Sequence, residues 1–162
     1  DLVDEGKRTA YGYDAKMCAL NRVGTIATDF RFEDKSGRVR RLHDVKADFT
    51  VLFFSNPGCE ACMTIINALK ESPRISELIS AGKLAVLNIY IDEDLEAWRS
   101  YMPIYPEEWL NGFDPDFVIR TDVLYNVRAI PSLYLLDKDK TVIMKDAVTE
   151  RVLDFVNRFV VL

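Results

Sequence analysis

Two apolar segments of strand length, separated by a helical segment, constrain the fold of this chain more than any other feature. Residues 50–55 and 84–91 are continuous runs of β-favouring apolar residues, the pattern of strands buried on both faces. Between them, residues 59–70 place apolar side chains at helical spacing. A strand, a helix and a strand in this order predict a βαβ unit, with a parallel pair and a right-handed crossover.

The segments around this unit predict further elements of an α/β domain. Residues 29–42 alternate apolar and charged side chains around a Lys-Ser-Gly turn, which indicates a β-hairpin. Residues 74–81 predict a short second helix that ends at a glycine. After the second buried strand we expect Asp92 to be the N-cap of a helix whose buried face carries Trp98.

The second half of the chain predicts an ordered insertion, a hairpin and a final helix. Residues 103–117 combine prolines and aromatic side chains, and we interpret them as an insertion with its own local core. A short helical turn is expected at residues 122–125. Residues 132–136 and 141–145 predict an antiparallel hairpin, followed by a helix over residues 149–160. The side chains of this helix expected in the core are Val152, Phe155, Val156 and Phe159.

These elements fit one domain with a short extension in 162 residues. We expect an N-terminal helical extension over residues 1–23 and an α/β domain with a mixed sheet over residues 24–162. An apolar content of 49% supports a real core, and a net charge of −5 gives no nucleic-acid footprint. No apolar run approaches the ~18 residues that a membrane span needs.

Cys59 and Cys62 form a Cys-x-x-Cys motif at the point where a buried strand ends and a helix begins. The unpaired N–H groups and partial positive charge of a first helical turn favour a thiolate, the species that attacks a disulfide. Cys62 lies one turn further on, and we expect it to be the more buried, resolving thiol. The predicted cycle is attack by Cys59, a mixed disulfide, and displacement of the reduced partner by Cys62.

Ile130 and Pro131, before a predicted strand, supply the second part of the expected site. A proline at the start of a strand has no N–H to donate to the hydrogen bonds of the sheet. It therefore belongs at an edge of the sheet or at an unusual peptide bond. A cis bond there would expose the Ile130 backbone beside the cysteines, where an extended substrate segment could pair with it. With Pro57 and Gly58, these residues make up the expected substrate groove.

Two stretches resemble the thioredoxin superfamily. They are residues 56–62, Asn-Pro-Gly-Cys-Glu-Ala-Cys, and residues 127–137, Val-Arg-Ala-Ile-Pro-Ser-Leu-Tyr-Leu-Leu-Asp. The N-terminal hairpin, residues 24–30 and the central insertion are more similar to its TlpA/ResA branch. The insertion and residues 145–147 are similar to extracytoplasmic members from Bacteroides-type bacteria.

This resemblance, which covers about residues 24–160, implies a fold, a chemistry and a location. The implied fold is a thioredoxin-like three-layer sandwich with a cis Pro131, and the implied activity is that of a thiol–disulfide oxidoreductase. The partners would be disulfide-containing or dithiol proteins and an upstream thiol protein that donates electrons. No organic cofactor and no metal is implied, and the location would be the periplasm or a membrane anchor facing it.

The sequence departs from the family pattern at three positions near the cysteines. Thioredoxin carries a buried acid six residues before the first cysteine and a tryptophan directly before it, where this chain has Phe53 and Gly58. ResA-like members often place a glutamate three residues after the second cysteine, where this chain has Ile65. Glu60, inside the motif, is therefore the remaining candidate for proton transfer. Its negative charge beside Cys59 disfavours the thiolate, which predicts a reductant-leaning pair.

Two interpretations of the cysteines as structural groups stay open. A structural disulfide is one, although a loop this short gains little entropy from a cross-link. A Cys3His zinc site is the other, and its ligands would be Cys18, His43, Cys59 and Cys62. Only one of these ligand pairs has finger-like spacing. We interpret Cys18 as a small buried apolar residue and His43 as a surface or structural one.

Two functional alternatives also stay open. A peroxidase would need a Pro-x-x-x-Thr-x-x-Cys pattern, and residues 52–59 lack the proline and threonine at the required positions. A redox-inert, thioredoxin-like binding module is the second alternative. Tyr105 and Trp109 of the insertion are its candidate contact residues, if they are exposed.

Overall fold

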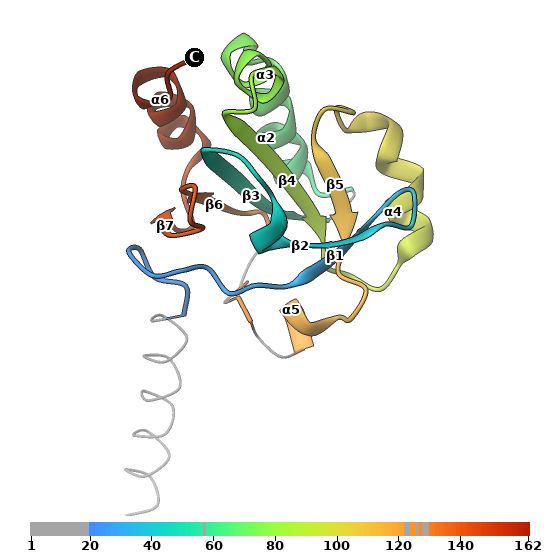
Figure 1. Cartoon of the computed structure of the whole chain (residues 1–162). Coiled ribbons are helices and arrows are strands. Elements are labelled where there is room, and N and C mark those ends of the chain that lie inside the picture. Colours follow the sequence, from blue (N-terminus) through green and yellow to red (C-terminus); the bar gives the residue numbers. More distant parts are fainter. Residues whose placement is uncertain (1–19, 57, 122–123, 126, 128–129) are drawn as a thin grey trace, which may run out of the picture.

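The centre of the protein, as seen in a computed structural model, is one mixed seven-stranded sheet in the order β2-β1-β5-β4-β3-β6-β7 (Figure 1). The structure describes residues 20–56, 58–121, 124–125, 127 and 130–162. The predicted extension over residues 1–23, including Cys18, therefore lies outside these ranges except for its last four residues. In the described part of the chain, no helix is long and apolar enough to cross a membrane.

The predicted βαβ unit forms the middle of this sheet. β3 (Phe49–Ser55) and β4 (Leu84–Tyr90) pair in parallel along their whole length. They are connected by α2 (Glu60–Lys70) and α3 (Pro73–Ser80), and the Ser72 hydroxyl caps α3. The unit therefore follows the apolar pattern of the sequence closely.

Alternating side chains of β3 build a separate core on each face of the sheet. Val51 and Phe53 pack with residues of α2, α3 and α6 (Thr149–Phe159). Leu52 and Phe54 belong to the opposite core, which also receives Ile119 of α5 (Val118–Thr121). Figure 1 shows α2, α3 and α6 together on one side of the sheet and α5 on the other. The predicted α/β architecture with three layers is confirmed.

The expected insertion over residues 103–117 contains a strand that the sequence analysis missed. β5 (Leu110–Phe113) pairs in parallel with β4 and antiparallel with β1 (Arg31–Asp34). Its sequence, Leu-Asn-Gly-Phe, is short and lacks the β-branched residues that mark a strand. A Cβ atom at Gly112 would stand 2.9 Å from the Glu33 carbonyl oxygen, so glycine permits the close approach of β1.

β5 thereby connects the predicted N-terminal hairpin to the central sheet. The hairpin consists of β1 and β2 (Val39–Arg41), with Phe32 opposite Arg40, and is followed by the 3-10 helix η1 (Leu42–Asp44). The hairpin prediction is confirmed. Tyr105 and Trp109 are only 5% and 3% exposed, so they are local core and not a contact surface.

The helix after β4 begins two residues later than predicted. α4 (Leu95–Tyr101) has Asp94 as its N-cap, whose carboxylate accepts a hydrogen bond from the Ala97 amide at 3.0 Å. The prediction that Asp92 caps this helix is wrong. Trp98 is buried as expected, and a second 3-10 helix, η2 (Met102–Ile104), follows α4.

The C-terminal elements agree with the prediction except at one side chain. β6 (Ser132–Leu136) and β7 (Val142–Met144) form the expected hairpin, and α6 follows them. Phe159, predicted to be buried, is 64% exposed because it lies in the last turn of α6. Its ring is tilted against that of Phe155, with the two ring centroids 5.1 Å apart. Of the helical turn expected at residues 122–125, positions 122 and 123 lie outside the described residues.

Candidate active site

Cys59 is the N-cap residue of α2, so its sulfur lies at the amino end of that helix. Its backbone is extended, and its Sγ accepts a hydrogen bond from the Cys62 amide at 3.3 Å. An N-cap side chain normally satisfies one of the unpaired amides of the first turn, and here a thiol sulfur does so. This contact and the helix dipole both favour negative charge on the sulfur.

Cys62 lies one turn further along α2 and is almost completely enclosed. Its side chain is 1% exposed, within the core that also contains Phe53, Ile66 and Leu69. Burial raises the pKa of the Cys62 thiol to about 12, although the Asn56 amide, which favours the thiolate, opposes this effect. The two cysteines therefore differ as the sequence predicted, with a half-buried first sulfur and a buried second one.

Pro131 lies beside the end of β3 that leads into the cysteine motif. β3 and β6 pair antiparallel with Phe54 opposite Ser132, which brings residue 131 next to the carboxyl end of β3. The Ile130–Pro131 peptide bond is cis. Ile130 is half-buried and packs against the same core as both cysteines.

Gly58 is exposed directly before Cys59, and Pro57 lies outside the described residues. Gly58 has a φ of 82°, a left-handed conformation that favours glycine. A Cβ atom at this position would come within 3.3 Å of the Tyr101 hydroxyl. Tyr101, from the end of α4, therefore occupies space that a side chain at position 58 would fill.

The positions of the missing family carboxylates are occupied by apolar side chains in the structure. Phe53 is fully buried in β3, and Ile65 packs half-buried against the same core. Glu60 is exposed in the first turn of α2. The observed surroundings of Cys62 therefore contain apolar groups and backbone amides in place of the usual acid.

A chain of buried polar side chains near Cys62 was missed by the sequence analysis. The Ser55 hydroxyl donates to the Asn88 side-chain oxygen at 2.6 Å, and Asn88 donates to Asn111 at 3.2 Å. Burial raises the pKa of Tyr105, while hydrogen bonding to Ser55 and Asn88 lowers it in part. The sequence did not indicate this chain, because each of its polar residues stands alone in its own segment. Their hydrogen-bond partners lie in other strands or in the insertion, and local sequence does not show which segments come together.

Asn56 and Asp92 form a second polar contact that the sequence did not indicate. Asn56 follows β3 directly, and its side-chain nitrogen donates to the Asp92 carboxylate. Asp92 follows the end of β4, the parallel neighbour of β3. Both residues therefore lie at the carboxyl edge of the sheet, where the cysteine motif begins.

His43 makes hydrogen bonds within the N-terminal part of the domain. Its ring Nε2 lies 2.7 Å from the Ala27 carbonyl oxygen, and its amide donates to Asp29 at 3.0 Å. Within the described ranges, no three His, Cys, Asp or Glu side chains are grouped so that they could hold a metal ion. Cys18, the fourth ligand of the zinc alternative, is outside those ranges.

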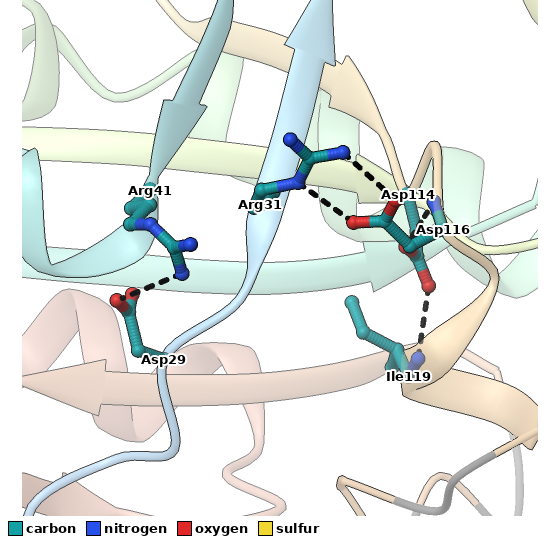
Figure 2. A network of polar contacts seen from close by, with 6 residues as sticks. All are labelled: Asp29, Arg31, Arg41, Asp114, Asp116 and Ile119. Atoms are coloured by element: carbon teal, nitrogen blue, oxygen red, sulfur yellow. Dashed lines mark hydrogen bonds and ion pairs between the residues drawn. The ribbon is translucent and has the colours of Figure 1, made fainter.

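A polar network holds the loop between β5 and α5 (Figure 2). The buried Asp114 carboxylate accepts hydrogen bonds from the amides of Asp116 at 3.1 Å and Ile119 at 2.9 Å. Arg31 of β1 binds Asp116 through two hydrogen bonds of 2.8 Å. The loop that leads from the sheet into α5 is thus fixed to the sheet by β1.

Comparisons with solved structures agree with this geometry. A thioredoxin-like protein from Bacteroides caccae superposes with a TM-score of 0.93 and 41% identity over 96% of this chain, which spans 56% of that protein's length. The C-terminal domain of an uncharacterized protein from Bacteroides fragilis matches with a TM-score of 0.82 and 45% identity, covering 86% of this chain and 100% of that domain. A domain of a possible thiol-disulfide isomerase from Cytophaga hutchinsonii matches with a TM-score of 0.68 and 25% identity, covering 85% and 92%. No protein-family model and no curated protein matches the chain.

Proposed function

Because the chain belongs to the thioredoxin-like family, which includes thiol–disulfide oxidoreductases, we propose that it exchanges disulfides in other proteins through Cys59 and Cys62. The observation that carries this proposal is the position of Cys59 as the N-cap of α2, with its sulfur accepting the Cys62 amide at 3.3 Å. This environment favours the thiolate that disulfide exchange requires.

The proposed reaction has two steps. The Cys59 thiolate attacks one sulfur of a substrate disulfide, the substrate S–S bond breaks, and the departing sulfur takes a proton from solvent. The Cys62 thiol then loses its proton and attacks the Cys59 sulfur, which releases the second substrate sulfur as a thiol. Two electrons pass to the substrate, and Cys59 and Cys62 become a disulfide that an upstream thiol protein reduces.

Pro131, Ile130 and Gly58 form the proposed substrate groove beside Cys59. The pairing of Phe54 with Ser132 supports this role, because it brings the start of β6 next to the cysteine motif. Ile130 offers backbone groups just before β6, with which an extended substrate segment can pair as an added strand. Pro57 completes the groove in this proposal.

We propose a reductant-leaning protein that acts outside the cytoplasm. Glu60, exposed in the first turn of α2, places negative charge near Cys59 and supports the reducing direction. Its further role in proton transfer is part of the same proposal. The extracytoplasmic location is implied by the family resemblance and is testable by fractionation of cells that express the protein.

An insulin-reduction assay tests the proposed activity. The wild-type protein with dithiothreitol should accelerate insulin precipitation, and Cys59→Ala should abolish the acceleration because it removes the sulfur that makes the first attack. Phe159→Ser, which changes an exposed side chain on α6, serves as the control and should keep full activity. Equal rates for the wild-type protein and Cys59→Ala would reject the exchange mechanism in favour of a redox-inert binding module.

A further inference from the structure

Tyr101, at the end of α4, places its hydroxyl over Gly58, the residue directly before Cys59. A Cβ atom at Gly58 would stand 3.3 Å from the Tyr101 hydroxyl oxygen. Apart from the residues adjacent to Gly58, no other described atom lies within 4 Å of that point. Gly58 itself is exposed. The hydroxyl therefore lies at the surface of the cysteine motif, in the space that a side chain before Cys59 would fill.

The Tyr101 hydroxyl is free to bind a group from outside the protein. Tyr101 is half-buried and packs against the core that contains Cys62. Among the described residues its hydroxyl makes no hydrogen bond, and it is not one of the buried polar atoms that lack a partner. The oxygen is therefore accessible to solvent. A tyrosine combines an apolar ring with a polar tip that donates or accepts a hydrogen bond, which suits it to recognition.

The chain topology puts Tyr101 and Pro131 on opposite sides of Cys59. β3, which leads into the cysteine motif, lies between β4 and β6 in the sheet. α4, which ends at Tyr101, follows β4, and Pro131 directly precedes β6. Cys59, Tyr101 and Ile130 all pack against the same core. A substrate disulfide that reaches the Cys59 sulfur is therefore flanked by Ile130 on the β6 side and by Tyr101 on the β4 side.

We propose that Tyr101 is a substrate-binding residue that determines specificity: its hydroxyl donates a hydrogen bond to a peptide carbonyl beside the disulfide that Cys59 attacks. This inference rests on the proposed function and narrows its substrates to disulfides flanked by peptide backbone. Because Gly58 has no side chain, that backbone can approach the hydroxyl closely. Tyr101 takes no part in breaking bonds or in transferring protons during the exchange.

The test compares two disulfides that oxidise the reduced protein. One is a cyclic peptide closed by a disulfide, and the other is diethyl disulfide, which has no peptide group. Reduced protein, freed of dithiothreitol, is mixed with an excess of either, and its oxidation is followed by acid quenching and alkylation of the remaining thiols. Tyr101→Phe keeps the ring and removes only the hydroxyl. It should slow oxidation by the peptide about three- to ten-fold, the effect of one lost neutral hydrogen bond, and change oxidation by diethyl disulfide less than about two-fold.

Two controls separate substrate binding from general effects on the site. Ser100→Ala removes a hydroxyl from the adjacent residue of α4, where it donates to the Ala97 carbonyl at 2.7 Å on the exposed face. It should leave both oxidation rates unchanged. In Tyr101→Phe, alkylation of Cys59 by iodoacetamide should proceed at the wild-type rate, because the hydroxyl acts on the substrate and not on the Cys59 sulfur. A merely structural role of Tyr101 would change alkylation and both oxidations together.

Two results would overturn the role of Tyr101. One is an unchanged rate of oxidation by the peptide in Tyr101→Phe, and the other is equal slowing with the peptide and with diethyl disulfide. Both leave disulfide exchange by the wild-type protein intact, so the proposed function would survive. A wild-type protein that neither disulfide oxidises rejects the proposed function itself, and the role of Tyr101 with it.

Discussion

At the scale of single residues, two sulfurs one helical turn apart lie in different environments. Cys59 caps α2 and is half-buried, whereas Cys62 is enclosed by apolar side chains. One sulfur is accessible to a substrate disulfide, and the other is protected until a mixed disulfide brings its target within reach. The order of the two steps follows from this difference.

Burial of Cys62 predicts a pH dependence of stability in the reduced protein. Its thiol pKa is raised from 9.0 to about 12 in the folded state, so the unfolded chain ionises first as pH rises. The stability contributed by the neutral thiol is fully present below pH 9.0 and is lost as pH rises toward 12. Denaturant unfolding should therefore show the reduced wild-type protein losing stability relative to Cys62→Ala in this range. Parallel curves for the two proteins would contradict the assigned burial of this thiol.

The cysteines of the site could be predicted from the sequence, whereas their polar neighbours could not. A Cys-x-x-Cys motif between a buried strand and a helix is a local pattern, and its first residue is the observed N-cap. From the sequence alone, Asp92 and Asp94 are equally good candidates for the N-cap of α4. The observed start of the helix shows that Asp94 is the N-cap. The contact between Asn56 and Asp92 depends on strand order, which local sequence does not encode.

At the scale of secondary structure elements, β5 depends on the absence of a side chain at one position. Gly112→Ala should destabilise the protein by about 1–3 kcal/mol, because its Cβ would press on the Glu33 backbone, which cannot move aside like a flexible side chain. Gly82→Ala serves as the comparison, because no atom lies within 4 Å of a Cβ at that position. There the positive φ of 73° alone should lower the free energy of unfolding by about 1 kcal/mol. Thermal or urea unfolding measures both. A Gly112→Ala protein more stable than Gly82→Ala would contradict the crowding at β1.

The loop between β5 and α5 gives a second prediction at this scale (Figure 2). Asp114→Ala removes the acceptor for the Asp116 and Ile119 amides and should cost about 1–3 kcal/mol of unfolding free energy. Asp114→Asn should cost less, because its side-chain oxygen still accepts a hydrogen bond and burial already raises the pKa of the Asp114 carboxyl. Asp116→Asn weakens the exposed pair with Arg31 and should cost at most about 1 kcal/mol. Equal losses for Asp114→Ala and Asp116→Asn would contradict this assignment.

The elements with strong patterns were predictable, and those that depend on distant partners were not. β3 and β4 are continuous apolar runs, and both were predicted to within one residue. β5 contains asparagine and glycine, and it forms because β1 and β4 supply partners on its two sides. The exposure of Phe159 also depends on where the last turn of α6 extends past the elements that cover the rest of the helix. Helical spacing predicts the apolar face of a helix but not how far along its length that face is covered.

At the scale of the whole molecule, the proposed reducing direction predicts which redox form is more stable. A pair that passes electrons to its substrates favours its own disulfide form over its dithiol form. The disulfide form should therefore unfold at a higher urea concentration than the dithiol form. A dithiol form that is the more stable of the two would indicate an oxidising protein. Glu60→His, which removes the negative charge, should bring the urea unfolding midpoints of the disulfide and dithiol forms closer together.

The three-layer architecture was predictable because the continuous apolar run of β3 specifies a strand buried on both faces. Helices must then cover both sides of the sheet, and the observed cores on its two faces agree with this requirement. The placement of the N-terminal hairpin was less predictable, since β1 joins the sheet by pairing with β5, a strand with a weak sequence pattern.

Trapping of the mixed disulfide shows which of the two sulfurs attacks the substrate. A Cys62→Ser protein incubated with a disulfide-containing peptide should accumulate a covalent adduct through Cys59, detected by intact mass and released by dithiothreitol. Cys59→Ser should form far less adduct at Cys62, because the Cys62 thiol is buried and protonated. Adduct formation through Cys62 in preference to Cys59, or no adduct in either variant, would contradict the account.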